Sequence, residues 1–389
     1  MAISFETLSQ VLPVVSGAGY PVLIRGRHGI GKSEGVYQFA EAIGLPVIER
    51  RASQMTEGDL LGLPDQNGVD VAGRKATAYN PPAWLLEACT RPVLLFIDEI
   101  DRATTEVRQG FFELTDSRKI AGFTLHPDTI IIAAVNGGEN ASEYSVADMD
   151  PAEQDRYTTF DVAPTVEDWL GWAVGESPAE RVSMAFSEVR DNARSLRVSK
   201  ASGEVRPVDE MIVDFIRQNP DHIEHKDTFE PGKVYPSRRS WVRFSDAGRS
   251  GSLFEDCKAN RALIAHLSAG FVGLEASIAF TDFAANYERQ VSVEDILVHG
   301  RMDRIKDFGV IEHTAMVSKL TASDYLSREM TASELQNLAN YFVRVPSEVG
   351  MTLFSAIAQG DHGPANISEF YALTADTGAS VQEHVSEVL

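Results

Sequence analysis

The feature that most constrains this fold is a glycine-rich segment that directly follows a short apolar run. The segment is Gly26-Arg27-His28-Gly29-Ile30-Gly31-Lys32-Ser33, which fits the pattern G-x-x-x-x-G-K-[ST] after Val22-Leu23-Ile24. Glycines let the backbone curl so that its N–H groups converge on phosphate oxygens, while the lysine reaches the outer phosphates and the serine hydroxyl joins a Mg²⁺ shell. A helix that begins near Lys32 would direct its positive dipole end at the same anion. The segment therefore predicts a strand, a phosphate-binding loop and a helix, with a nucleoside triphosphate as ligand.

The alternative for this segment is a glycine turn that joins a strand to a helix. A strand-like run before it and a helix-compatible run after it favour the phosphate loop. The His28 side chain is assigned no chemistry, because the variable positions of such loops accept many residues. The predicted nucleotide-binding residues are Gly26, His28, Gly29, Ile30, Gly31, Lys32, Ser33 and Glu34.

A second apolar run, residues 93–97, ends in the two carboxylates Asp98 and Glu99. Asp98 would hold Mg²⁺ together with Ser33, and Glu99 would polarise an attacking water as a general base. If this segment is considered alone, the ordinary interpretation is a strand followed by two solvated acidic residues. The phosphate loop upstream favours the catalytic one.

A third strand candidate, residues 129–135, ends at Asn136. An amide at that position is expected to reach the γ-phosphate or the attacking water from the neighbouring strand end. Asn136-Gly137 is also an ordinary turn dipeptide, so only its position after the acidic strand supports the functional interpretation.

Charge and composition exclude several classes of function. The 389 residues carry a net charge of −22, which disfavours non-specific binding to nucleic acid or to an anionic membrane. Cys89 and Cys257 are far apart in sequence, the histidines show no zinc-type spacing, and no run of eighteen apolar residues occurs. The N-terminal residues also lack the pattern of a targeting signal, so a cytoplasmic location is expected.

The order of patterns along the chain predicts an α/β fold followed by helices. Short β-branched runs alternate with helical patterns up to about Pro164, which indicates a parallel sheet with helices on both faces. Predicted strands are 22–24, 46–49, 93–97, 129–135 and 160–162. An ordered insert rich in glycine and proline occupies residues 57–82. Helix starts then dominate, at Ser177, near Val208, at Ser237, at Thr321 and at Thr331.

Taken together, six ordered motifs resemble the MoxR-like, dynein-related branch of the AAA+ ATPases. The motifs are the glycine-rich loop and the segments 58–64, 81–85, 96–103, 134–137 and 155–157. The resemblance covers residues 5 to about 243. It implies domains at 1–164 (the AAA+ core with the insert at 57–82) and 165–265 (an α-helical lid). Residues 266–389 form a helical extension that resembles nothing we can name.

The resemblance also implies a ring, usually hexameric, with ATP and Mg²⁺ held at each subunit junction. In such rings Asn136 looks like the sensor 1 residue, and Arg156 looks like the arginine finger offered to the neighbouring subunit. Arg239 looks like the sensor 2 arginine that contacts its own subunit's nucleotide, with Arg238 as the alternative in register. The alternative for Arg156 is a surface ion pair with Glu153 or Asp155, and the alternative for Arg238 and Arg239 is two solvated arginines beside an N-cap. Arg102 and Arg118 are placed near the subunit interface by the same resemblance.

The function implied is ATP hydrolysis that remodels a protein partner or assembly. Relatives often work with a separate protein that bears a von Willebrand factor A domain. The insert would line or cap the central pore, where Tyr79 or Trp84 could grip a substrate, although core packing is the commoner fate of a lone tryptophan. The rival function is a DNA-linked NTPase or translocase of the same branch, and a nucleotide-gated scaffold with little turnover is a third.

Overall fold

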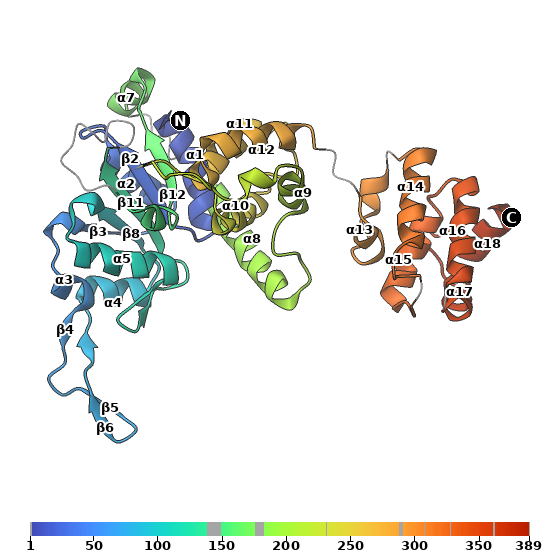
Figure 1. The fold of residues 1–389 in the computed structure, drawn as a ribbon, viewed down its shortest axis with the longest axis horizontal. Coiled ribbons are helices and arrows are strands. Elements are labelled where there is room, and N and C mark those ends of the chain that lie inside the picture. The colour runs from blue at the N-terminus through green and yellow to red at the C-terminus, as the bar shows by residue number, and fades with distance from the viewer. Residues whose placement is uncertain are drawn as a thin grey trace. The chain divides into compact units, whose positions relative to one another are not determined.

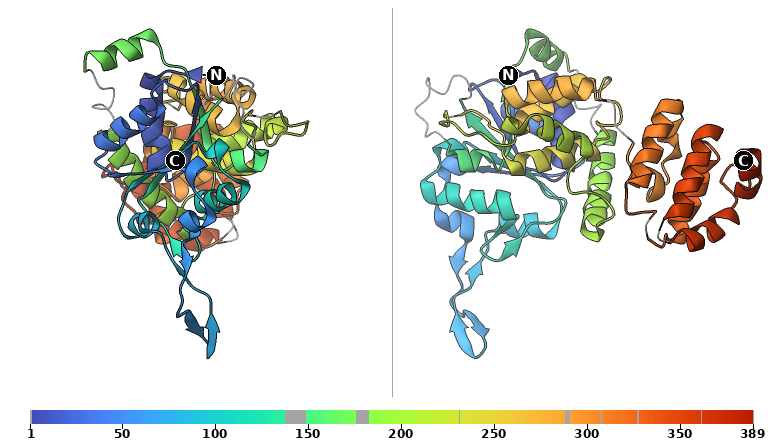
Figure 2. Two further views of the ribbon diagram at one scale, coloured as in Figure 1. Left: turned by 90° about the vertical axis from the view of Figure 1, so that its left-hand side faces the viewer. Right: turned by 45° about the vertical axis from the view of Figure 1, so that its right-hand side comes forward.

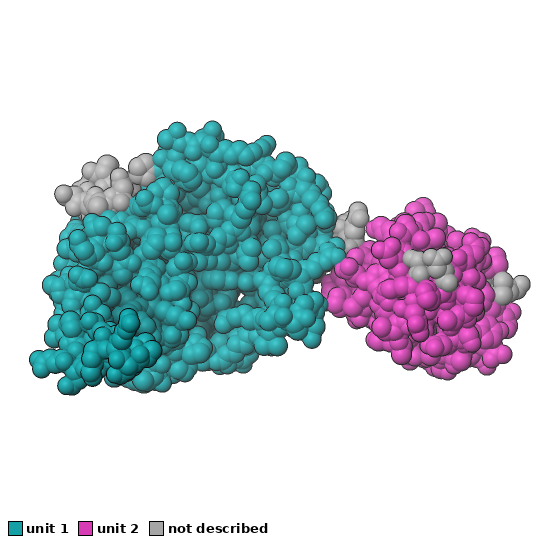
Figure 3. All heavy atoms as spheres, turned by 60° about the horizontal axis from the view of Figure 1, so that its bottom comes forward, with its two compact units in different colours: residues 1–287 teal, residues 288–389 magenta. Residues whose placement is uncertain are grey.

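The chain forms two compact units, residues 1–287 and residues 288–389 (Figure 3). The computed structural model describes residues 2–137, 149–175, 183–230, 232–287, 291–306, 308–326, 328–360 and 362–388. The boundary expected at 265/266 falls inside helix α11 (Arg261–Val272), and the next helix, α12 (Leu274–Ala285), also belongs to the first unit. The physical reason is a shared core, because Leu267 and Phe280 are buried in the same hydrophobic cluster as Val22 of the sheet.

The first unit is built on a six-stranded sheet in the order β1-β12-β2-β11-β8-β3, and every recorded pairing in it is parallel. This confirms the predicted α/β class. The strands are β1 (Ala2–Ile3), β2 (Val22–Gly26), β3 (Val47–Arg51), β8 (Leu94–Asp98), β11 (Ile130–Asn136) and β12 (Thr158–Val162). All five predicted strands are present, and β1 is the additional one.

Helices cover both faces of the sheet (Figures 1 and 2). Successive strand residues point to opposite faces, so Ile24 joins one hydrophobic cluster and Leu23 joins another. The Ile24 cluster contains side chains of α1 (Phe5–Gly17), α2 (Lys32–Ala42), α9 (Glu210–Gln218), α10 (Arg238–Ser250), α11 and α12. The Leu23 cluster contains side chains of α3 (Glu57–Leu61), α4 (Ala83–Thr90) and α5 (Thr105–Ser117).

The predicted insert forms a thin projection from the Leu23 side of the sheet (Figure 1). Two short antiparallel ladders build it, β4 (Leu63–Pro64) with β7 (Tyr79–Asn80) and β5 (Val69–Val71) with β6 (Arg74–Ala76). Trp84 lies at its base and is only 5% exposed, and its indole N–H donates to the carbonyl of Asp59 at 2.9 Å. Trp84 is therefore a packing residue, whereas Tyr79 is exposed.

The lid region begins with α7 (Val166–Ala173) and continues with α8 (Ser183–Ser202). The helix start predicted at Ser177 lies outside the described residues. The starts predicted near Val208 and at Ser237 are confirmed by α9 and α10, and the Ser237 hydroxyl accepts from the backbone N–H of Ser240.

The second unit is helical, and its own buried cluster contains none of the residues of the first unit's clusters. Its helices are α13 (Val293–Leu297), α14 (Val310–Thr321), α15 (Ala332–Phe342), α16 (Ser347–Gln359), α17 (Gly363–Tyr371) and α18 (Val381–Val388). Thr331 caps α15 as predicted. The start predicted at Thr321 is wrong, because Thr321 ends α14 and its hydroxyl donates back to the carbonyl of Val317 at 2.9 Å. No helix in the described part of the chain is both long enough and apolar enough to cross a membrane.

Candidate active site

The predicted site residues gather where three parallel strands end. Asn136 at the end of β11 is in register with Gly26 at the end of β2, and Ala133 of β11 is in register with Ile97, one residue before Asp98. The carboxyl ends of parallel strands lie at one edge of a sheet, which is where open α/β sheets bind ligands. The amide, the start of the glycine-rich loop and the acidic pair therefore share this edge.

The glycine-rich loop leads directly into α2, whose first residue is Lys32. Gly29 and Gly31 have φ angles of 74° and 97°, which side chains other than glycine rarely adopt. Gly31 occupies the N-cap and makes no side-chain cap, so the first amides of α2 lack a side-chain acceptor there. This geometry suits an oxyanion at the helix start.

Lys32 is buried at this edge, and its hydrogen-bond acceptors among the described residues are all neutral. Its ammonium donates to the carbonyls of Gly26 and Arg27 at 2.8 and 2.9 Å and to Oδ1 of Asn136 at 3.0 Å. Burial lowers the pKa of Lys32, and the negative charges of Asp98, Asp101 and Glu99 oppose that shift. The lysine is thus a partly desolvated cation whose hydrogen bonds can be exchanged for stronger ones to phosphate.

The two carboxylates after β8 have different surroundings. Burial raises the pKa of Asp98, which accepts the backbone N–H of Glu99 at 2.9 Å. Glu99 has a left-handed backbone (φ 54°), and its Oε2 accepts a hydrogen bond from the Ser53 hydroxyl at 2.6 Å. The described residues contain no cluster of three or more metal-ligating side chains. Magnesium beside a nucleotide takes only one or two carboxylates, and phosphate and water complete its shell. A single half-buried carboxylate such as Asp98, whose pKa is raised by burial, therefore fits a magnesium ligand.

Sequence reasoning missed two supporting residues. Asp101 is 4% exposed and its Oδ2 accepts the backbone N–H of Asn136 at 3.3 Å, so it fixes the end of β11. Burial raises its pKa. Ser53, which holds Glu99, lies in a short 3-10 helix over Ala52–Gln54 after β3. The acidic motif itself contained Asp101, whereas no local pattern marks Ser53.

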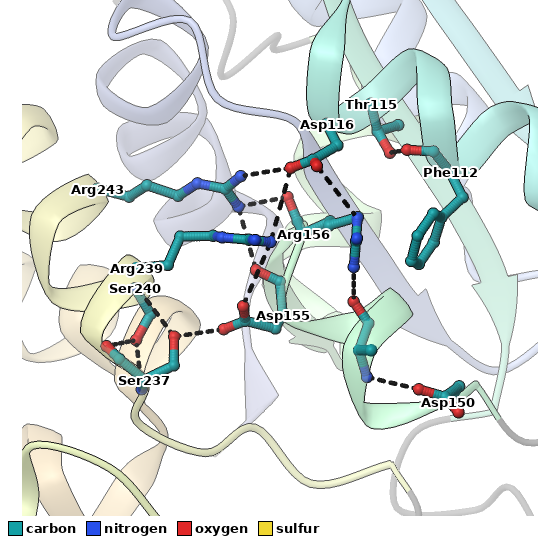
Figure 4. Close-up of polar contacts among 11 residues, drawn as sticks. Phe112, Thr115, Asp116, Asp150, Asp155, Arg156, Ser237, Arg239, Ser240 and Arg243 are labelled. Atoms are coloured by element: carbon teal, nitrogen blue, oxygen red, sulfur yellow. Dashed lines mark hydrogen bonds and ion pairs between the residues drawn. The ribbon is translucent and has the colours of Figure 1, made fainter.

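Arg156 belongs to a second cluster, built around Asp116 near the end of α5 (Figure 4). Its guanidinium lies 3.4 Å from the ring centroid of Phe112 and 3.7 Å from Asp116, and it also donates to the carbonyl of Ala152. The side chain is 16% exposed. Arg156 therefore has a defined orientation that its neighbours on α5 and α6 (Pro151–Gln154) set.

Arg239 and Arg243 extend from α10 into the same cluster (Figure 4). Arg239 lies 3.6 Å from both Asp116 and Asp155, and Arg243 donates to the carbonyls of Asp155 and Arg156 at 3.1 and 2.7 Å. Arg238 instead points to Glu224 and is 73% exposed. Of the two arginines in the predicted sensor 2 segment, Arg239 belongs to the Asp116 cluster and Arg238 does not.

This cluster lies at the opposite edge of the sheet from the glycine-rich loop. Arg156 precedes β12, whose first residue, Thr158, is in register with Val22, the first residue of β2, whereas Gly26 ends that strand. A five-residue strand separates the two edges by roughly 13 Å at 3.3 Å per residue. No hydrogen bond or ion pair between described residues joins Lys32 or Asn136 to Arg156 or Arg239. The expected contact of Arg239 with its own subunit's nucleotide therefore does not match the geometry.

Arg118, expected near a subunit interface, is partly buried and makes structural hydrogen bonds within its own chain. Its guanidinium donates to the carbonyls of His126 and Thr129 at 3.0 and 2.6 Å, which ties the end of α5 to the start of β11. Burial lowers its pKa.

Part of this chain matches a known protein family. Residues 21–157 match the family described as "AAA domain (dynein-related subfamily)". The chain contains an AAA+ domain. The matched residues run from the start of β2 to the residue before β12, so they include the glycine-rich loop, the acidic pair, Asn136 and Arg156. The match implies nucleotide binding. A search of curated proteins found no match.

Two solved structures show distant similarity to this chain. A crystal structure of a putative ATPase from Cytophaga hutchinsonii aligns with 12% identity and a TM-score of 0.36, covering 70% of this chain and 78% of that one. A full-length MCM homologue from Methanopyrus kandleri aligns with 12% identity and a TM-score of 0.32, covering 72% of this chain and 53% of that one. This chain thus spans about half of the MCM homologue.

Proposed function

We propose that this chain is a ring-forming, Mg²⁺-dependent AAA+ ATPase of the MoxR-like branch that uses ATP hydrolysis to remodel a protein partner. The observation that carries the proposal is the separation of two charged groups of residues on one sheet. Gly26, Lys32, Asp98 and Asn136 lie at one edge, and Arg156 lies at the other.

Each residue at the first edge has a chemical role that its surroundings support. Lys32 would exchange its carbonyl acceptors for phosphate oxygens, and Ser33 and Asp98 would hold Mg²⁺, which would neutralise charge on the phosphates. Once the Glu99 carboxylate releases its hydrogen bond from the Ser53 hydroxyl, Glu99 orients and deprotonates the attacking water. Asn136, released by Lys32, contacts the γ-phosphate from the adjacent strand end.

The second edge supplies the guanidinium groups for the next subunit's nucleotide. Arg156 and Arg239 both lie beside Asp116, with side chains 16% and 44% exposed, and neither is near the chain's own loop. In this proposal both act on the nucleotide of a neighbouring subunit. A fixed, permanently charged fork is worth about 10³ to 10⁵ in the rate of phosphoryl transfer. In a closed hexameric ring, every nucleotide site would receive these arginines from a neighbouring subunit.

A mixing experiment tests the shared site. Lys32→Ala and Arg156→Ala chains are each expected to hydrolyse ATP at less than about 1% of the wild-type rate. When the two variants are mixed, some junctions pair an intact loop with an intact Arg156, so activity returns. A mixture no more active than the sum of its parts, under conditions where mass photometry shows mixed rings, contradicts the proposal.

Glu99→Gln tests the catalytic assignment separately from binding. The amide cannot accept the proton of water, so hydrolysis should fall by about 10² to 10⁴ while ATP affinity stays near the wild-type value. Phosphate release and fluorescent-nucleotide titration measure the two quantities. Unchanged hydrolysis would remove Glu99 from the site and favour a scaffold with little turnover.

The remodelling part of the proposal rests on the projecting insert, which exposes Leu63, Val69, Val71 and Tyr79. Apolar side chains on a thin projection suit contact with a polypeptide. The partner would include a separate protein with a von Willebrand factor A domain. Stimulation of the ATPase by DNA in a salt-sensitive way would instead favour the translocase function.

A further inference from the structure

Arg243 is a largely buried arginine to which the proposed ATPase site assigns no role. It lies on α10, one turn after Arg239, and its side chain is only 12% exposed. The carboxylate of Asp116 lies 3.7 Å from its guanidinium, which is longer than a hydrogen bond. A largely buried charge without a hydrogen-bonded counter-ion costs free energy. Arg243 must therefore make other contacts that compensate for this cost.

The compensating contacts of Arg243 are to the main chain that carries Arg156. Its Nη1 donates to the carbonyl oxygens of Asp155 and Arg156, at 3.1 and 2.7 Å. A guanidinium is planar and presents its donors in a fixed fork. Two successive carbonyl groups are therefore held in a fixed relation to α10 (Figure 4).

Two further residues near the start of α10 contact the same segment. The hydroxyl of Ser237, the N-cap of α10, donates to Oδ1 of Asp155 at 2.6 Å. Arg239 lies 3.6 Å from the carboxylate of Asp155. Residues 155–156 are thus joined to one helix through both side chain and main chain.

Helix α10 is itself firmly anchored. Trp241 and Phe244 are buried in the hydrophobic cluster that contains Ile24 of β2, and the indole N–H of Trp241 donates to the carbonyl of His222 at 2.8 Å. Close-packed aromatic side chains allow little displacement. Helix α10 therefore gives residues 155–156 a rigid support.

A second support comes from α5. The Phe112 ring lies 3.4 Å from the Arg156 guanidinium, and Asp116 lies 3.7, 3.6 and 3.7 Å from Arg156, Arg239 and Arg243. Three guanidinium groups repel one another when they converge. The single carboxylate of Asp116 lies beside all three and offsets this repulsion.

We propose that Arg243 and Asp116 are positioning residues for Arg156. Arg243 fixes the main chain at residues 155–156 to the lid helix α10, and Asp116 holds the three guanidinium groups together. The inference rests on the proposed function, in which Arg156 acts on the nucleotide of a neighbouring subunit. The lid helix of one subunit then controls hydrolysis in the next.

A purely structural role of these two residues predicts a different pattern. Damage to the fold would impair the chain's own nucleotide site, raise the KM for ATP and persist in mixtures with any other variant. A positioning role lowers kcat alone, and the defect appears in the site of the neighbouring subunit.

Single variants separate kcat from KM in a steady-state ATPase assay. Arg243→Met removes the donors and keeps an apolar stem, and Asp116→Asn keeps the shape of the side chain and removes its charge. Because a displacement of about 1 Å can cost about 10²-fold in rate, each should lower kcat at least about tenfold while KM stays near the wild-type value. Arg249→Met is the matched control, since Arg249 is on the same helix and also donates to a carbonyl, that of Arg206 at 2.9 Å. A wild-type kcat in Arg243→Met, or an equal loss in Arg249→Met, overturns the proposal.

Mixed rings, verified by mass photometry, show which site each variant damages. Arg243→Met mixed with Lys32→Ala should exceed the sum of the two activities, because intact loops meet correctly held arginines. Mixed with Arg156→Ala it should not, because neither chain offers a positioned Arg156. Asp116→Asn should behave in the same way, which keeps the test decisive if Arg243→Met does not assemble. The mixture of Lys32→Ala with Arg156→Ala is the reference, and its failure contradicts the ring function itself. If the reference recovers activity, recovery of these variants with Arg156→Ala, or none with Lys32→Ala, overturns the positioning role alone.

Discussion

At the scale of single residues, Lys32 shows how a binding group is kept ready without its ligand. It is 8% exposed and bonds to two carbonyls and an amide rather than to a carboxylate, although three carboxylates act on it electrostatically. Hydrogen bonds to charged groups contribute about 1.5–3 kcal/mol. Lys32→Met should therefore weaken binding of a fluorescent ATP analogue about 10- to 100-fold, whereas Lys75→Met, at an exposed position of the insert, should leave it unchanged. Equal affinities for both variants would contradict the assignment.

His313 in the second unit should make stability depend on pH. The ring is 3% exposed and its Nδ1 lies 3.2 Å from the Tyr341 hydroxyl, and burial lowers the pKa of His313 below its ordinary value. Below about pH 6.5 the unfolded chain takes up a proton that the folded chain resists. The stability contribution is therefore present above that pH and is lost as the pH falls, by at most about 1.4 kcal/mol per pH unit.

Urea unfolding followed by far-ultraviolet circular dichroism between pH 7.5 and 5.5 measures this dependence. His313→Gln should flatten the slope of the second unit's unfolding free energy, because an amide does not titrate. His299→Gln, at an exposed position in the same unit, should keep the wild-type slope. A slope that survives in His313→Gln would assign the titration to another group.

At the scale of elements, the sequence predicted the strands better than the connections. Apolar runs with β-branched residues located all five long strands, because burial on both faces of a parallel sheet requires such runs. β1 was missed because two residues, Ala2–Ile3, carry no periodicity, and only pairing with β12 makes them a strand. Thr321 was misread because a hydroxyl can bond back to its own helix as readily as it can cap the next one.

The residues of the candidate site also fall into those that the sequence could predict and those that it could not. Residues at the ends of strands, such as Asp98 and Asn136, were predictable because strand order and direction bring these ends together. The position of Arg239 was not, because it depends on how α10 packs against α5 and α6 far away in sequence. The Ser53 bond to Glu99 likewise joins residues 46 positions apart.

Helix α7 is an amphipathic element whose polar side faces the protein. Asp168 accepts the backbone N–H groups of Phe5 and Glu6 at the start of α1, at 3.2 and 3.3 Å, whereas Trp169 and Trp172 are 61% and 53% exposed. Trp84 and Trp241 are buried. Acrylamide should therefore quench mainly the α7 indoles, and a Trp169→Phe/Trp172→Phe variant should lose more than about half of the quenchable fluorescence. Undiminished quenching in that variant would show that α7 is covered.

At the scale of the whole molecule, the chain has hydrophobic clusters that do not cross between its units. Two clusters cover the two faces of the sheet in residues 1–287, and a third lies entirely within 288–389. A unit of about 100 residues with its own buried aromatic and aliphatic core is large enough to fold cooperatively. Cooperative unfolding should therefore occur separately in each unit.

All four tryptophans lie in the first unit, so their fluorescence follows that unit alone. Phe244 and Phe342 are both fully buried, one in each unit, and truncating either to alanine should cost about 3–5 kcal/mol. Phe244→Ala should lower the urea midpoint of the tryptophan transition, whereas Phe342→Ala should leave that transition in place and shift a transition seen only by circular dichroism. The two substitutions are equal in chemistry and differ only in the core they damage. A tryptophan midpoint that moved with Phe342→Ala would therefore show that the second unit stabilises the first unit directly.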